Sequence, residues 1–202
     1  MWKKLALAPV IAFALALPAQ AEKLPLGQIS SYLNAMKTAQ AKFTQVNGDG
    51  SISTGTLYIK RPGNVRFEYD PPEKTLVLAD AGAVAIFDGN SNTGPETYPL
   101  DHTPLSIILA QNVDLGRARM VTGHASDGKT TTVTAQDPAH PEYGNIQMVF
   151  TGSPVELRQW VIQDDSGSLT TVILGELRTG VGIANNKFSI EGEKSRLRAD
   201  RR

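Results

Sequence analysis

The sequence predicts a mainly β protein with some α-helix, built as one curved antiparallel sheet covered by helices. Two observations lead to this class. Short segments with a two-residue apolar period follow one another at the spacing of a meander, with Gly, Pro, Asp or Asn turns between them. Helical apolar spacing occurs in one segment near the start and one in the middle of the chain.

Residues 1–21 have the layout of a Sec-type signal peptide. Lys3 and Lys4 precede an apolar run from Leu5 to Leu17, which is shorter than the roughly 20 residues that a membrane-spanning helix needs. The small-residue pattern AQA closes the segment at position 21. We expect cleavage there and a single domain over residues 22–202. Position 22 is Glu rather than a Cys that could be acylated, so we expect the mature chain to be released and not anchored.

Composition excludes several classes of protein. The 20 basic and 20 acidic side chains give zero formal charge, so no long-range field draws this chain to nucleic acid. The absence of cysteine excludes disulfides, thiolate metal sites and cysteine nucleophiles.

The first element predicted in the mature chain is an amphipathic helix over residues 26–43. Ile29, Leu33, Met36 and Phe43 recur at helical steps there. Residues 53–61 and 64–69 then alternate as strands and are joined by an Arg-Pro-Gly-Asn turn at 61–64. Two further strands are predicted over residues 75–79 and 84–87.

The middle of the chain begins with a polar loop over residues 89–99. A short apolar helix is predicted over residues 103–110, where Thr103 is a suitable cap and Pro104 a suitable first helical residue. Strand patterns resume afterwards, over residues 119–122, 130–135, 145–151, 157–163 and 168–178.

No catalytic residue, metal site or cofactor is predicted. The common enzyme motifs are missing from the sequence. His102, His124 and His140 each occur in turn-like stretches, where an exposed loop histidine is the simpler interpretation. Asp164 and Asp165 precede Ser-Gly and are better explained as a hairpin turn than as part of a carboxylate site.

The alternation of the first strands places a set of apolar side chains on the inward face of the sheet. The set consists of Leu57, Ile59, Val65, Phe67, Tyr69, Leu76, Leu78, Val84 and Ile86. Taken alone, such a set is an ordinary core. Arg61 has the same parity, and its guanidinium keeps its proton and needs acceptors if it is buried. It therefore lies either in a turn at a wet rim or against polar groups of a covering element.

Several segments resemble one known family, the LolA family of periplasmic outer-membrane lipoprotein carriers. The run GTLYIKRPGNVRFEY at 55–69 is similar to the family's G-x-L-x-ϕ-K-R-P strand and turn and the aromatic-bearing strand after it. The segments AKFTQ at 41–45 and TPLSIIL at 103–109 resemble its F-x-Q segment and its mid-chain helix. QDD at 163–165 and NKFSI at 186–190 resemble its C-terminal strands. Phe67 stands where relatives often have Trp.

The resemblance implies an incomplete, half-open antiparallel β-barrel with helices as a lid over an apolar cavity. The cavity would hold the acyl chains of triacylated lipoproteins. Its lining would be the inward set named above together with Leu105, Ile108 and Leu109 of the mid-chain helix. Arg61 matches the family arginine that bonds the lid and helps to close it.

The same resemblance implies partners and a compartment. The chain would be a periplasmic monomer that receives cargo from an inner-membrane ABC exporter and delivers it to the outer membrane, through an acceptor there if one is present. Two other interpretations stay open from the residues alone. One is a carrier or sensor of another lipid, such as a glycolipid, on the same scaffold. The other is an assembly-factor domain whose apolar set is solid core. A hydrolase has the least support.

Overall fold

The computed structural model describes residues 22–91, 93–117 and 119–200, so the leader assigned to residues 1–21 lies outside the described residues. The first half of the chain contains α1 (Leu26–Ala35), β1 (Thr38–Val46), β2 (Ile52–Lys60), β3 (Asn64–Tyr69), β4 (Thr75–Asp80), β5 (Ala83–Asp88), β6 (Glu96–Pro99), the 3-10 turn η1 (Leu100–His102) and α2 (Leu105–Leu109). The second half contains β7 (Val121–Ser126), β8 (Thr130–Gln136), η2 (Pro141–Tyr143), β9 (Asn145–Thr151), β10 (Glu156–Gln163), β11 (Leu169–Leu174), β12 (Arg178–Thr179), η3 (Asn185–Phe188) and α3 (Ile190–Asp200).

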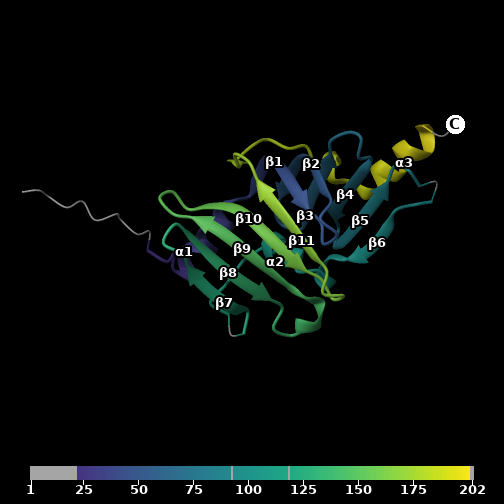
Figure 1. Ribbon diagram of the computed structural model, residues 1–202. Coiled ribbons are helices and arrows are strands. Elements are labelled where there is room, and N and C mark those ends of the chain that lie inside the picture. The colour runs from purple at the N-terminus through teal and green to yellow at the C-terminus, as the bar shows by residue number, and fades with distance from the viewer. Residues whose placement is uncertain (1–21, 92, 118, 201–202) are drawn as a thin grey trace, which may run out of the picture.

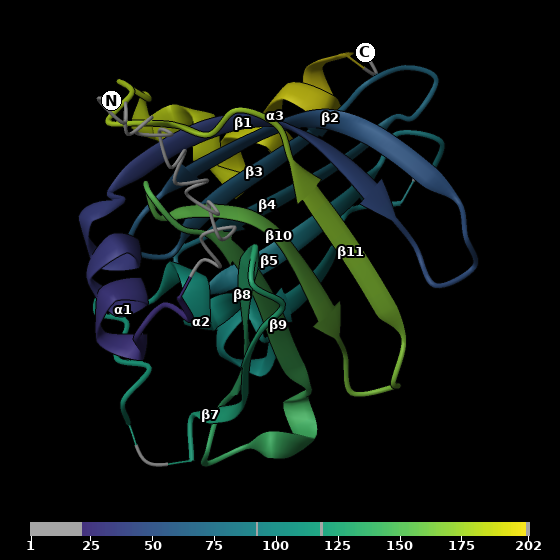
Figure 2. The ribbon, with the colours of Figure 1, turned by 60° about the vertical axis from the view of Figure 1, so that its left-hand side comes forward.

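All the strands belong to one antiparallel sheet. Its order is β6-β5-β4-β3-β2-β1-β11-β10-β9-β8-β7, and β12 pairs with β1 beside β11. The sheet curves strongly (Figures 1 and 2), yet no pairing within the described residues joins its two edges, β6 and β7. The predicted class, an incomplete antiparallel barrel with helices, is confirmed.

Helices cover both faces of the sheet. In Figure 2, α1 and α2 lie at the open, concave side, and α3 lies across the outside of the sheet, where it packs on β4 and β5. The main hydrophobic core joins α1 and α2 to the concave face of the sheet. A smaller core lies on the convex face beneath α3, where Leu78, Ala85, Phe87 and Ile190 are buried.

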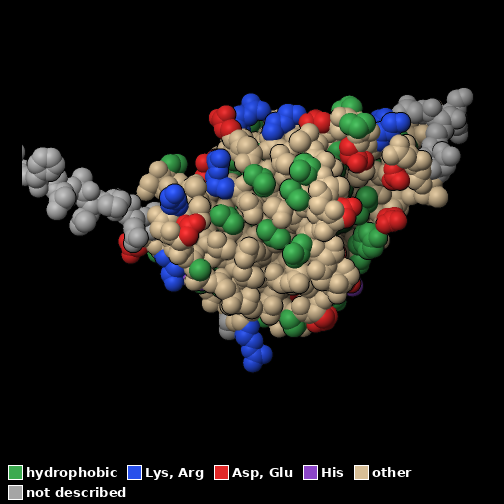
Figure 3. Space-filling model, in the orientation of Figure 1, with side chains coloured by type: hydrophobic (Ala, Val, Ile, Leu, Met, Phe, Trp, Pro, Cys, Tyr) green, Lys and Arg blue, Asp and Glu red, His purple; other side chains and the backbone are tan. Residues whose placement is uncertain are grey.

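No helix of the described residues covers the outer face of β9 to β11. Figure 3 shows hydrophobic side chains spread singly over this face, with most of the charged side chains along its rims. Leu169 and Ile173 of β11 are 48% and 43% exposed. No helix within the described part of the chain is long and apolar enough to cross a membrane.

The first helix is shorter than predicted. It ends at Ala35, and residues 38–46 form β1. Ala39, Ala41 and Phe43 alternate inward along this strand. The step of four residues from Ala39 to Phe43 fits a strand as well as a helix, which is why the sequence pattern does not separate them.

Three further segments differ from their predictions. The segment 89–99, predicted as a loop, ends in the short edge strand β6. The segment 168–178, predicted as one strand, divides into β11 and β12, with Gly175 between them. The NKFSI segment is not a strand but the turn η3 and the start of α3, a helix that the sequence did not predict.

Candidate binding cavity

A cavity of about 570 Å³ opens on the concave side of the sheet, between the β3–β6 half, the β10–β11 half and the η1–α2 segment. This size is typical of cavities that bind small molecules. The apolar and aromatic lining residues are Phe67, Tyr69, Val77, Val84, Ile86, Tyr98, Pro99, Pro104, Leu105, Tyr143, Trp160, Ile162 and Val172. The polar ones are Gln45, His102, Thr103, Asp164, Asp165 and Thr170.

Aromatic rings form the floor of the cavity. Phe43 makes edge-to-face contacts with Phe67 and Tyr69, with ring centroids 5.3 and 5.2 Å apart. Phe67 makes a similar contact with Trp160 at 6.4 Å. The Tyr69 hydroxyl donates a 2.7 Å hydrogen bond to Gln45 Oε1, but burial dominates and raises the pKa of Tyr69 to about 12. The tyrosine is therefore neutral and its hydroxyl is paired.

Trp160 is the exception to this pairing. It lies on β10 opposite Met148 of β9 and Val172 of β11 and is 1% exposed. Its indole Nε1 has no hydrogen-bond partner among the described residues. A buried donor without an acceptor costs about 1–3 kcal/mol.

Arg61 closes the other end of the concave side. It follows β2 and is 7% exposed. Its Nη1 donates to the carbonyl of Leu33 in the last turn of α1, and its Nη2 and Nε donate to the carbonyl of Ala110 at the end of α2. Nη2 also lies 3.3 Å from Asn34 Oδ1. The guanidinium thus joins the carboxyl ends of two helices, where free carbonyls and the helix dipole both favour a cation.

Burial lowers the pKa of Arg61, but a guanidinium stays protonated in proteins. The positive charge of Arg61 is therefore stabilised on the concave side of the sheet by two backbone carbonyl oxygens and one side-chain amide oxygen. It has no carboxylate partner among the described residues. Of the two alternatives open from the sequence, the arginine bonds a covering element.

Further hydrogen bonds hold the covering segment to α1 and to the sheet. Asn34 accepts from Val113 N and donates to Val113 O, both at 2.8 Å. Leu115 N donates to Ser30 Oγ at 3.1 Å, and Gly63 N donates to Leu109 O at 2.9 Å. Together with the Arg61 contacts, these hydrogen bonds join α1, α2 and residues 110–115 into one unit, which we call the lid.

A stack of three rings lies at the rim of the cavity. Tyr143 of η2 stacks between His102 of η1, at 4.5 Å, and His140, at 4.7 Å. A hydrogen bond to Glu142 raises the pKa of His140. His124 is remote from this stack and contacts the carbonyl of Leu24. No group of residues able to hold a metal ion occurs in the part of the chain that the structure describes.

The hairpin role of Asp164 is confirmed. Its Oδ1 accepts hydrogen bonds from Ser166 N, Ser166 Oγ and Ser168 N. The Ser166 side chain makes the largest contribution to lowering the pKa of Asp164. The carboxylate thus serves a turn at the cavity rim.

The structure divides the predicted lining into three groups. Five of the residues line the cavity: Phe67, Tyr69, Val84, Ile86 and Leu105. Five others are buried in the main core and do not reach the cavity surface: Leu57, Ile59, Val65, Ile108 and Leu109. The last two, Leu76 and Leu78, are a correction, because they face the opposite side of the sheet and pack in the small core under α3.

The parity of β4 explains this correction. Val77 and Ala79 pair with Phe67 and Val65 of β3 and share their inward face. Leu76 and Leu78 therefore point outward, where α3 covers them. The sequence pattern does not show which of these residues face inward, because residues 76–79 are all apolar.

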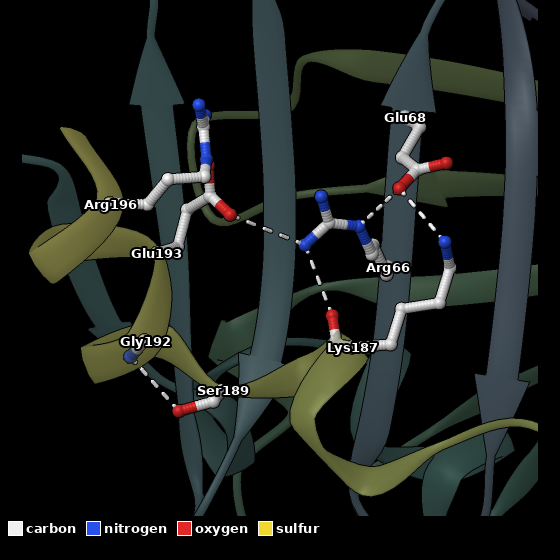
Figure 4. Close-up of polar contacts among 7 residues, drawn as sticks. All are labelled: Arg66, Glu68, Lys187, Ser189, Gly192, Glu193 and Arg196. Carbon is white, nitrogen blue, oxygen red and sulfur yellow. Dashed lines mark hydrogen bonds and ion pairs between the residues drawn. The ribbon is translucent and has the colours of Figure 1, made fainter. Parts of the chain in front are cut away.

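The convex face carries a charged cluster that sequence reasoning missed (Figure 4). Arg66 of β3 donates to Glu68 at 2.6 Å and lies 3.7 Å from the buried Glu193 of α3. Lys187 contacts Glu68 at 3.1 Å, and Arg196 contacts Glu193. Burial acts to raise the pKa of Glu68, but the bonds from Arg66 and Lys187 together lower it. The cluster attaches η3 and α3 to the sheet.

A second hollow of about 370 Å³ lies beside this cluster, but its chemistry differs from that of the concave cavity. It is lined by Arg66, Lys74 and Arg196 as well as by several carboxylates. The concave cavity contains neither Lys nor Arg. We therefore take the concave cavity as the site for an apolar ligand.

Sequence reasoning also missed lining residues from the second half of the sheet. Trp160, Ile162 and Val172 belong to the predicted strands 157–163 and 168–178. Their two-residue alternation is a signal that could have found them. The alternation does not show that β11 pairs with β1, and this pairing brings the second half of the sheet beside the first.

Comparison with known proteins places the chain among carriers. Residues 34–191 match the family model described as outer membrane lipoprotein carrier protein LolA. The outer-membrane lipoprotein carrier protein of Methylococcus capsulatus is 26% identical over 185 residues, which cover 84% of each chain. That of Azotobacter vinelandii is 24% identical over 189 residues, which cover 90% of each chain. Among solved structures, LolA superfamily protein NE2245 from Nitrosomonas europaea has a TM-score of 0.41 and 10% identity and covers 84% of this chain and 98% of that one.

Proposed function

This chain belongs to the LolA family of outer membrane lipoprotein carrier proteins, and on that premise we propose that it shields the acyl chains of lipoproteins in the concave cavity while they cross the periplasm. The family is one of carriers and not of enzymes. The observation that carries the proposal is a cavity of about 570 Å³ with an apolar and aromatic wall under a hydrogen-bonded lid.

The energetics favour a closed cavity of this kind. Moving a CH₂ group out of water is favourable by about 0.8 kcal/mol, so an acylated protein does not cross an aqueous compartment unaided. Each CH₂ group gains the same free energy in the membrane as in the carrier. Delivery therefore requires a carrier whose empty state is itself stable, so that the cargo is released rather than retained.

Arg61 supplies that stability in the proposal. Its hydrogen bonds to Leu33, Asn34 and Ala110 are made in the closed lid, and hydrogen bonds to a charged group contribute about 1.5–3 kcal/mol each. Acyl chains that enter the cavity separate the lid from the sheet and break these bonds. Re-forming them favours unloading.

The proposal includes the partners that family membership implies. After its signal peptide is cleaved, the chain works as a periplasmic monomer. It receives triacylated lipoproteins from an inner-membrane ABC exporter and delivers them to the outer membrane, to an acceptor there where one is present. The leader over residues 1–21 and the single domain over residues 22–202 are part of this proposal.

Depletion of the protein in cells, followed by membrane fractionation, tests the function. We expect lipoproteins to accumulate at the inner membrane and a wild-type copy to restore their sorting. A matched pair of variants tests the cavity. Ile86→Trp fills it from β5, while Ile173→Trp adds the same bulk on the outer face of β11.

We expect Ile173→Trp to restore sorting and Ile86→Trp to fail, although both fold. Thermal unfolding of the purified variants checks the folding. Normal lipoprotein sorting in depleted cells contradicts the proposal. Mass spectrometry of lipid that copurifies with the protein then distinguishes a carrier of another lipid, such as a glycolipid.

A further inference from the structure

A ring contact joins two segments that lie far apart in the sheet. His102 belongs to η1, which directly follows the edge strand β6, and Tyr143 belongs to η2, which connects β8 to β9. Seven strands, β5 to β1 followed by β11 and β10, lie between β6 and β9 in the sheet. The two ring centroids are nevertheless 4.5 Å apart. The contact therefore bridges the concave side of the sheet.

This bridge lies where the cavity opens to solvent. His102 and Tyr143 both line the cavity, and His102 is exposed. Tyr98 and Asp164, which are further exposed lining residues, lie on β6 and in the β10–β11 turn. Phe67 on the floor is buried. A guest that reaches the floor from solvent therefore enters beside the contact between His102 and Tyr143.

The bridge is supported from both sides. Leu100 N of η1 donates a 2.8 Å hydrogen bond to the carbonyl of Gly82 in the β4–β5 turn, which fixes η1 to the first half of the sheet. On the other side, His140 stacks on Tyr143 at 4.7 Å, and Tyr143 N donates to the carbonyl of His140 at 3.1 Å. His140 is not among the residues that line the cavity. It is a positioning residue that holds the Tyr143 ring against His102.

The bridge also completes the attachment of α2. The segment η1 runs into α2 through Thr103 and Pro104, so the ring contact holds the N-terminal end of this lid helix. Arg61 holds its other end through the carbonyl of Ala110. Stacked ring pairs are favourable beyond the area that they bury. The lid helix is thus attached at both ends, by two contacts of different chemistry.

We propose that the His102–Tyr143–His140 stack is a gate at the cavity entrance, whose rings part to admit or release an acyl chain and then close again. This inference rests on the proposed carrier function and gives the cavity an entrance that is separate from the Arg61 contacts. For a single short chain, the gate closes over the empty and the loaded cavity alike. It therefore controls the rates of uptake and release and not the affinity.

Trp160 reports the arrival of a guest. It lines the cavity, and it is the only tryptophan in residues 22–202. Monodecanoylglycerol with bromine in its chain quenches tryptophan fluorescence at short range, and a cavity of about 570 Å³ suits a guest of this size. Stopped-flow mixing of the mature chain with this neutral probe gives the uptake rate. Displacement by the unbrominated compound gives the release rate.

Tyr143→Ala removes the bridging ring. We expect uptake and release of the probe to become about 3- to 10-fold faster, while the dissociation constant stays within about twofold of the wild-type value. Tyr143→Phe keeps the ring and should restore the wild-type rates. His140→Ala should raise both rates by about 2- to 3-fold, because Tyr143 loses its support. Tyr58→Ala, the same change on the outer side of β2, is the matched control and should leave both rates unchanged.

A reversible crosslink gives a second test, because the chain contains no cysteine of its own. In the double variant His102→Cys/Tyr143→Cys, a short bis-thiosulfonate reagent ties η1 to η2, and a reductant frees them. We expect the tied protein to take up the probe at least about tenfold more slowly than the same protein after reduction.

Wild-type rates in Tyr143→Ala, or equal uptake by the tied and the reduced protein, overturn the gate while the carrier function stands. Failure of the reagent to tie the two cysteines overturns it as well, because the two positions then do not face each other. A change in affinity without a change in the uptake rate makes Tyr143 an ordinary wall residue and also excludes the gate. If the wild-type protein does not bind the probe, both the gate and the proposed hydrocarbon site are wrong.

Discussion

At the scale of the residue, Arg61 shows how one buried charge organises two helices. A guanidinium has five donors in a rigid fork, and here the fork spans carbonyls that lie 28 and 49 residues away in the chain. A lysine at this position would present a point charge and could not reach both helix ends in the same plane. The arginine therefore connects the closed lid to the end of β2.

Replacing Arg61 tests whether these bonds drive unloading. We expect Arg61→Leu to take up lipoprotein within about twofold of the wild-type level but to pass it to outer-membrane vesicles at least about tenfold more slowly, since the closed state loses charged hydrogen bonds. Transfer is measured as cargo recovered with the vesicles over time. Arg158→Leu, which removes a half-exposed arginine of β10, is the control. Transfer by Arg61→Leu at the wild-type rate excludes this role.

How far a residue's role can be predicted from sequence depends on what its partners are. The parity of β2 was enough to place Arg61 on the inward face. Its acceptors are mostly backbone carbonyls, which every residue has, so no pattern marks Leu33 or Ala110 in advance. The unpaired donor of Trp160 is likewise invisible before the strands are assembled around it.

At the scale of the element, alternation is reliable where the outward residues of a strand are polar and fails where the residues on both faces are apolar. β3 has polar outward residues, and its range is predicted without error. β4 has apolar residues on both faces because α3 covers its outer side. The helix itself has little apolar content beyond Ile190 and Leu197, so its amphipathic signal is weak.

The glycine of the G-x-L strand is required by the packing of one ring. A Cβ at Gly55 would lie 2.1 Å from the carbonyl oxygen of Glu68 and 2.7 Å from the ring of Phe43. Gly55 and Phe43 face each other in the β1–β2 pair, so the ring lies across the glycine and reaches the cavity floor. The motif therefore has glycine at this position because the Phe43 ring packs directly against the backbone.

We expect Gly55→Ala to lower the free energy of unfolding by about 1–3 kcal/mol, because overpacking forces the strands apart. Urea unfolding followed by circular dichroism measures the change. Gly27→Ala, in α1, is the matched control because nothing lies within 4 Å of the added Cβ. There the better helix propensity of Ala should raise stability by up to about 1 kcal/mol. A Gly55→Ala protein as stable as the wild type would show that the close contact relaxes without strain.

At the scale of the whole molecule, one continuous sheet separates two environments of different chemistry. The concave side holds the aromatic cavity under the lid, and the convex side holds α3 on a charged cluster. The lid is held to the sheet by side-chain packing in the main core and by a few hydrogen bonds, whereas the sheet is held by a continuous ladder of backbone hydrogen bonds. The lid is therefore the part that can move while the sheet persists.

Amide hydrogen exchange, measured with and without bound lipid, tests that division. We expect loading to speed the exchange of Gly63, whose N–H group bonds the carbonyl of Leu109 in the lid. The amides of Val113 and Leu115 bond within the lid and should keep their exchange rates when the lid moves as one unit. Central amides of β2 and β10 serve as the internal control and should keep their exchange rates. Slower exchange at Gly63 on loading would mean that lipid tightens the lid, contrary to the mechanism.

The two unpaired edges of the sheet have a mechanical consequence. In a closed barrel, strand number and stagger fix the radius. Here β6 and β7 can move apart without breaking any inter-strand hydrogen bond among the described residues. The internal volume is therefore set by side-chain contacts and adjusts to the bulk of the guest. One chain can accept guests of different girth, and each pays a free-energy cost that grows with the lid contacts it displaces.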